Sequence, residues 1–139
     1  MIYLKTDYVT IDLNEDLKLL EIEWHGLVLS SQYRETMEMV LDMLEEKNVE
    51  NFLINRQHMQ RISLADEKWR KEFWYPEFLK SSVKRSASVI SRDYYNEVSV
   101  SQLIEENDPG IKVERRSFYN YQEARKWLLE NSLVNSGST

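Results

Sequence analysis

Residues that could catalyse a reaction are few in this sequence. The only two histidines, His25 and His58, are not spaced to place two metal ligands on one helix face. Cysteine is absent, which excludes thiolate metal sites and cysteine nucleophiles, and three glycines make no loop that could cradle phosphates. We therefore expect no catalytic residue, no metal site and no cofactor, and predict that the protein is not an enzyme.

Polar side chains follow the short apolar run 52–54. Asn55, Gln57 and His58 come where a buried strand would end, and open α/β sheets bind ligands at the carboxyl ends of their strands. We predict these three as contacts at the sheet edge. His25, beside Trp24, is expected to be a strand-end histidine bonded to the backbone.

Ser63 stands just before a helical pattern, with Asp66 three residues later. This spacing is typical of a helix N-cap whose side-chain oxygen accepts from a backbone N–H of the first turn. We predict that Ser63 is structural. Its alternative role is a phosphorylation switch, because a phosphate also suits a helix N-terminus.

Four aromatic residues of the following helical segment have more apolar surface than one sheet face requires. Trp69 and Phe73 share one helix face, whereas Trp74 and Phe78 share another. Three interpretations stay open: packing into the core, a dimer interface, and the lid of a pocket for a small apolar ligand. The candidate partners are thus another protein, a second copy of the chain in a homodimer, or such a ligand.

The elements that position these residues follow from periodicity. Apolar and polar residues alternate over 8–13 and 20–24, which predicts a hairpin, and an apolar stripe with period 3.6 follows from Tyr33. Strands are expected at 52–54 and 87–90, and a final strand opens at 111–114. Helices are expected at 99–106, beyond Asn120 as N-cap, and after the possible caps Ser30 or Ser31. Pro76 predicts a kink or a break.

This order predicts an α/β domain. The stretch 52–91 reads as a β-α-β unit, which requires parallel pairing. We expect a mixed five-stranded sheet with an N-terminal antiparallel hairpin and about four helices packed on it. Residues 1–134 form a single domain in this interpretation, and 135–139 form a disordered polar tail.

Charge and hydropathy reduce the classes of partner that we expect. The formal charge is −6, which argues against a nucleic-acid binder. No apolar run approaches the length of a membrane span, and the first residues lack the pattern of a secretion signal, so we expect a cytoplasmic protein. Acidic side chains outnumber basic ones in residues 1–62 but not in the rest of the chain. This acidic half has either a solvated face or a patch that steers a basic partner.

Several segments together resemble the small stand-alone bacterial members of the STAS superfamily, named for sulfate transporters and anti-sigma-factor antagonists. They are Trp24-His25-Gly26, Tyr33, 52–57, 62–69, 84–90, and Phe118 with 124–128. The resemblance covers nearly the whole chain and implies the same order of strands and helices. It also implies a non-enzymatic regulatory or protein-interaction module, or alternatively a small-molecule or lipid-binding pocket between the aromatic helix and the sheet edge.

The sequence departs from this family at two places. Relatives carry an Asp and an Arg where this chain has Asn55 and Gln57, so a charge pair has become neutral. Anti-sigma-factor antagonists use a serine in the loop after the central strand, and Ser63 is the residue in a comparable place, after a longer loop.

Overall fold

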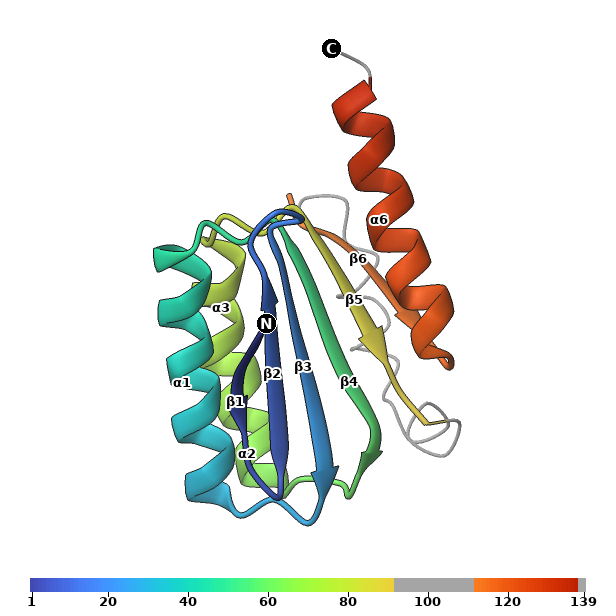
Figure 1. The fold of residues 1–139 in the computed structure, drawn as a ribbon. Coiled ribbons are helices and arrows are strands. Elements are labelled where there is room, and N and C mark those ends of the chain that lie inside the picture. The colour runs from blue at the N-terminus through green and yellow to red at the C-terminus, as the bar shows by residue number, and fades with distance from the viewer. Residues whose placement is uncertain (92–111, 138–139) are drawn as a thin grey trace.

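A six-stranded mixed sheet organises the described part of the chain (Figure 1), which in this computed structural model comprises residues 1–91 and 112–137. The strands, which lie side by side in this order, are β1 Ile2–Lys5, β2 Val9–Asn14, β3 Leu19–Gly26, β4 Asn51–Met59, β5 Arg85–Val89 and β6 Glu114–Phe118. The first three strands pair antiparallel, and β3 to β6 pair parallel. The mixed sheet and its N-terminal hairpin confirm the predicted fold class.

The strand count differs from the prediction of five, because β1 was not expected. Three of its four residues are exposed, and it pairs only with β2, with an irregularity between Ile2 and Leu4. An edge strand with this little burial leaves no alternation of apolar and polar residues in the sequence.

Helices cover both faces of the sheet. α1 Ser30–Glu46 and the chain from α2 Leu64–Trp69 through α3 Tyr75–Leu79 lie on one side, and α6 Tyr121–Gly137 lies on the other (Figure 1). α6 extends into the segment 135–139 that we expected to be a polar tail. The helix predicted over 99–106 and the first residue of the strand predicted from 111 lie outside the described residues.

The sheet alternates its side chains between two apolar cores. Leu20, Ile22 and Trp24 of β3 face α1, whereas Leu19 joins Leu53 of β4 in the core under α6. All five are fully buried. The period of two along a strand makes this division, and β4 is apolar on both faces because it lies inside the sheet.

Pro76 does not break the second helix. The π-helical turn η1 Arg70–Trp74 joins α2 to α3 and places Pro76 in the first turn of α3. Proline is tolerated in a first helical turn, where its missing N–H has no partner within the helix, so the helical chain continues through Pro76 and the predicted break is not observed.

The start of α1 differs from the prediction. Leu29, not Ser30 or Ser31, occupies the N-cap position, and the Gln32 side chain accepts a hydrogen bond from its backbone N–H at 3.0 Å. The Ser30 hydroxyl is engaged elsewhere, with Asp66 of α2. The other predicted cap is confirmed, since Asn120 Oδ1 accepts from the backbone N–H of Glu123 at 3.0 Å.

Candidate functional site

Two loops meet at the carboxyl ends of the parallel strands, at the lower end of Figure 1. One runs from β3 to α1, the other from β4 to α2. β3 and β4 end next to each other, with His25 opposite His58 and Gly26 opposite Met59. Gly26 has φ +61°, a left-handed conformation that glycine adopts without a steric penalty, and the chain turns there out of the sheet.

Asp66 holds these two loops together. Its Oδ1 accepts hydrogen bonds from the Ser30 hydroxyl at 2.6 Å and from Arg34 Nε at 2.8 Å. Its own backbone N–H donates to the Ser63 hydroxyl at 3.1 Å, which confirms Ser63 as the N-cap of α2. We call this group of Asp66, Ser30, Arg34 and Ser63 the Asp66 clamp; it ties the start of α1 to the start of α2.

The clamp is electrostatically consistent with an ionised carboxylate. Burial of Asp66 raises its pKa, but the hydrogen bonds from Ser30, Arg34 and Ser63 and the charge of Arg34 outweigh this and lower the pKa below its usual value. Only 2% of Asp66 is exposed. From its spacing to Ser63 we expected only a residue in the first turn of a helix, and its contacts with α1 were not predicted.

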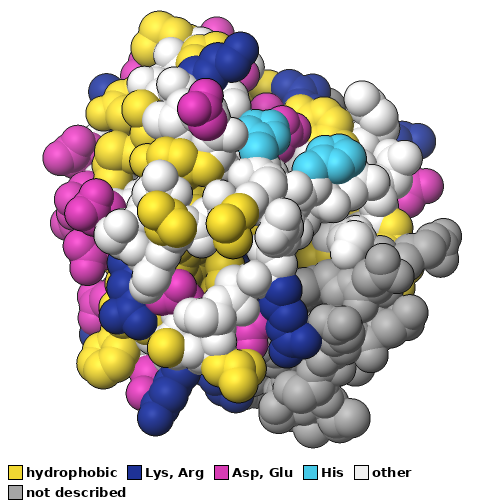
Figure 2. Space-filling view, turned by 90° about the horizontal axis from the view of Figure 1, so that it is seen from below, with side chains coloured by type: hydrophobic (Ala, Val, Ile, Leu, Met, Phe, Trp, Pro, Cys, Tyr) yellow, Lys and Arg dark blue, Asp and Glu magenta, His cyan; other side chains and the backbone are white. Residues whose placement is uncertain are grey.

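Three leucines stand exposed around the clamp. Leu27 and Leu29 precede α1, and Leu64 follows Ser63 at the start of α2; they are 67%, 56% and 74% exposed. We call these three the leucine patch. Figure 2 views this end of the molecule, where hydrophobic side chains alternate with polar ones and the two histidines lie next to each other. Sequence reasoning missed the leucine patch, because no periodicity marks apolar residues in loops.

The predicted sheet-edge contacts do not share one environment. Asn55 is buried, and its Oδ1 accepts from the backbone N–H of Gln57 at 3.0 Å. Gln57 and His58 are exposed, and Gln57 Nε2 lies 3.5 Å from the carbonyl of Tyr119. His25 differs from expectation: its Nε2 contacts the side chains of Thr10 and Glu23, each at 3.3 Å, and not the backbone.

The aromatic helix divides its four residues between core and surface. Trp74 and Phe78 are 4% and 2% exposed, stack on each other, and Trp74 Nε1 donates to the Met37 carbonyl at 2.7 Å. Trp69 is partly buried under the Arg34 guanidinium, whereas Phe73 is 65% exposed. The surplus apolar surface predicted for this helix therefore narrows to Phe73 and part of Trp69.

Among the cavities that the described residues form, two lie near the sheet, and neither of these two is lined by the aromatic helix. One of about 550 Å³ opens beside the leucine patch, between the β1–β2 turn and Leu27. The other, of about 150 Å³, lies on the α6 side of the sheet. Within the described residues no three His, Asp or Glu side chains gather as metal ligands, and no helix there has the length and hydropathy to cross a bilayer.

Comparison with known proteins bears on the fold. No protein-family model matches the sequence, and no curated protein matches it. Among solved structures, an uncharacterized protein of the DUF3478 family with a SpoIIAA-like fold, from Shewanella loihica PV-4, superposes with a TM-score of 0.54 at 14% identity. The match covers 92% of this chain and 99% of the other.

At that identity the likeness establishes architecture and nothing about the site. The fold implied by the resemblance inferred from the sequence is confirmed: this chain is a small α/β domain with the SpoIIAA-like, STAS-type fold.

Proposed function

We propose that the protein is a non-enzymatic interaction module that binds a partner protein through the leucine patch. The observation that carries the proposal is the exposure of Leu27, Leu29 and Leu64 on two loops that one buried carboxylate joins. Large aliphatic side chains that gather on a surface favour contact with an apolar partner surface.

The expected gain from covering the patch is sizeable. Full burial of a leucine contributes roughly 2 kcal/mol, so covering the exposed fractions of these three supports about 4 kcal/mol. The Asp66 clamp adds to this indirectly, because loops that are already ordered lose less conformational entropy when a partner binds. The cavity beside Leu27 offers a recess for a side chain of the partner.

A regulatory role fits this arrangement, since anything that loosens the clamp would displace Leu29 and Leu64 relative to each other. Ser63 acts in this proposal as the cap of α2 and not as a switch. The proposal includes a cytoplasmic location, which the absence of cysteine supports.

The test uses site-specific photocrosslinking in the native cytosol. A benzophenone amino acid at position 64 should trap one partner protein, and the same probe at Glu38, on the outer face of α1, should not. The double substitution Leu29→Ser and Leu64→Ser should then abolish capture of that partner by affinity-tagged protein. Phe73→Ser, which removes an exposed apolar side chain outside the patch, should leave capture unchanged.

The Phe73→Ser control also shows which result would contradict the proposal. Loss of capture with Phe73→Ser but not with the leucine variant would assign binding to the aromatic helix. Circular dichroism of each variant separates lost binding from lost folding, because exposed side chains contribute little to the core.

A further inference from the structure

Sheet pairing brings the two histidines of the chain together. His25 of β3 lies opposite His58 of β4, in a register that shifts just before them, between Glu23 and His25. Trp24 and Met59, which are their neighbours in the chain, pack into the core under α1. Because side chains alternate along a strand, both imidazoles lie on the opposite face of the sheet, the one that carries α6. Figure 2 shows the two rings next to each other.

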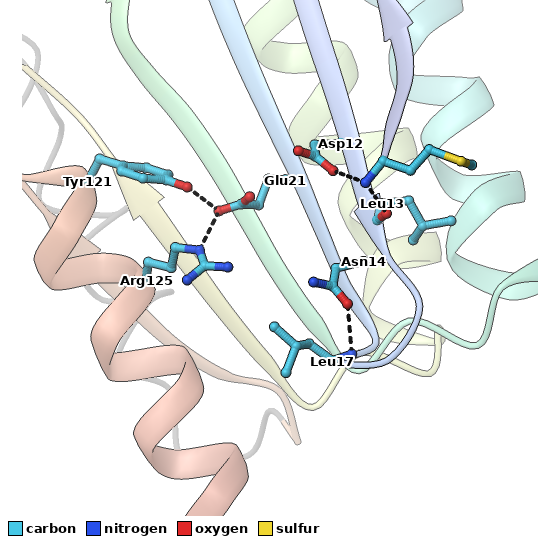
Figure 3. A network of polar contacts seen from close by, with 8 residues as sticks. Asp12, Leu13, Asn14, Leu17, Glu21, Tyr121 and Arg125 are labelled. Atoms are coloured by element: carbon cyan, nitrogen blue, oxygen red, sulfur yellow. Dashed lines mark hydrogen bonds and ion pairs between the residues drawn. The ribbon is translucent and has the colours of Figure 1, made fainter.

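α6 leaves this end of the sheet open. Its first turn is fixed over the middle of β3, where Glu21 accepts from the Tyr121 hydroxyl at 2.6 Å and lies 3.5 Å from Arg125 Nε (Figure 3). From there α6 runs away from the carboxyl ends of the strands (Figure 1), and His25 lies beyond Glu21 toward those ends. The His25 side chain is 35% exposed and His58 is exposed, so an ion in solution can reach both.

Glu23 orients the ring of His25. The Nε2 atom of His25 lies 3.3 Å from Glu23 Oε1 and 3.3 Å from Thr10 Oγ1. An ionised carboxylate only accepts hydrogen bonds, so the neutral ring carries its proton on Nε2 and keeps a lone pair on Nδ1. Thr10 is on β2, across β3 from β4, and the two ring nitrogens point in nearly opposite directions. Nδ1 is therefore turned away from Thr10, toward the strand of His58.

This arrangement is typical of a metal ligand. A histidine that binds a metal usually donates its other N–H to a carboxylate or a carbonyl, which fixes the tautomer and the direction of the ring. His58 supplies a second nitrogen, since the structure gives its ring no hydrogen bond or ion pair with any described residue. Neighbouring strands lie about 4.7–4.9 Å apart, so two imidazoles in this register can converge on one ion with metal–nitrogen bonds of about 2.0–2.1 Å.

We propose that His25 and His58 bind a divalent transition-metal ion such as Zn²⁺, with Glu23 as the positioning residue and water in the remaining coordination positions. Imidazole nitrogen suits Zn²⁺, Cu²⁺ and Ni²⁺, whereas Mg²⁺ and Ca²⁺ prefer oxygen ligands. His25 also lines the cavity of about 550 Å³, which leaves room for that water.

The proposal corrects the expectation of no metal site, which considered the spacing of histidines along one helix and not the pairing of two strands. The site uses no residue of the leucine patch or of the Asp66 clamp. It does not depend on the function proposed for them, and it can be tested without a partner protein.

The test is a titration of the full chain, without a histidine tag, followed by long-range ¹H–¹⁵N correlation spectra of the imidazoles. The sequence has only two histidines, so each imidazole signal belongs to one of them. Zn²⁺ should shift both sets of signals together and saturate at one ion per chain, and Mg²⁺ should shift neither. His25→Gln and His58→Gln should each weaken Zn²⁺ binding at least about tenfold, since even a residue that only orients a ligand contributes about 10- to 100-fold.

Glu23→Ala tests the positioning role. In the metal-free protein the ¹⁵N shifts of His25 should report a proton on Nε2; the variant should lose this preference and bind Zn²⁺ about tenfold more weakly. Glu38→Ala, which removes a carboxylate from the exposed face of α1, should change neither. Zn²⁺ shifts confined to one histidine, an equal response to Mg²⁺, or unchanged affinity in either glutamine variant would overturn the proposal.

Discussion

Replacement of Asp66 by asparagine tests whether one buried carboxylate joins the two loops of the candidate site. Asparagine keeps the shape and an acceptor oxygen, but it removes the charge from the hydrogen bonds with Ser30 and Arg34. Hydrogen bonds to a charged group contribute about 1.5–3 kcal/mol and neutral ones about 0.5–1.5 kcal/mol. Two weakened bonds therefore predict that Asp66→Asn lowers the free energy of unfolding by about 2 kcal/mol at pH 7.

The lowered pKa of Asp66 predicts the pH range in which wild type is more stable than Asp66→Asn. The pKa of Asp66 is lowered in the folded protein from its ordinary value of 3.8. A carboxyl group with a lowered folded pKa stabilises the protein above the unfolded pKa, and this contribution is lost as the pH falls through the folded pKa. The difference between wild type and Asp66→Asn should therefore be full at pH 7 and shrink below about pH 4.

Urea denaturation followed by tryptophan fluorescence measures both effects. Asp42→Asn is the matched control, because Asp42 is an exposed acid on α1, and this variant should change the stability by less than about 0.5 kcal/mol. A cost for Asp66→Asn no larger than that of the control, or a difference that persists unchanged at pH 3, would refute the reasoning about the clamp.

Three further predictions follow from other contacts. Ser63→Ala should lower the stability by about 1 kcal/mol in the same assay and leave partner capture intact; stoichiometric phosphate on Ser63 in protein from native cells would contradict its structural role. Light scattering should give a dimer of twice 16.7 kDa that Phe73→Asp converts to monomer, whereas a monomeric wild type at micromolar concentration would exclude self-association through this helix. Trp74 is unsuitable for that test because it is part of the core. The pKa of Tyr121 is raised by burial and by the Glu21 carboxylate, so Tyr121→Phe should leave the ultraviolet titration of tyrosine below pH 11 unchanged; one tyrosinate fewer in the variant would show that Tyr121 ionises normally.

Local signals in the sequence predicted the architecture because they act over a few residues. The alternation that predicted the hairpin reappears as Val9, Ile11 and Leu13, each at most 2% exposed. The caps at Ser63 and Asn120 were predicted for the same reason, since a cap bonds a backbone group only three residues away. β1 escaped prediction because its pairing with β2 leaves most of its side chains in solvent.

By itself, the sequence determined the fold class, the hairpin, the parallel strands after it and the lack of familiar catalytic motifs, because periodicity and residue type carry that information. Only the tertiary structure decided the candidate sites. Ser30 meets Asp66 across 36 positions of sequence, and Tyr121 meets Glu21 across 100. Such contacts depend on how helices pack against the sheet, and no local pattern encodes that packing. The same packing buried Trp74 and left Phe73 in solvent, although the two are neighbours in the chain.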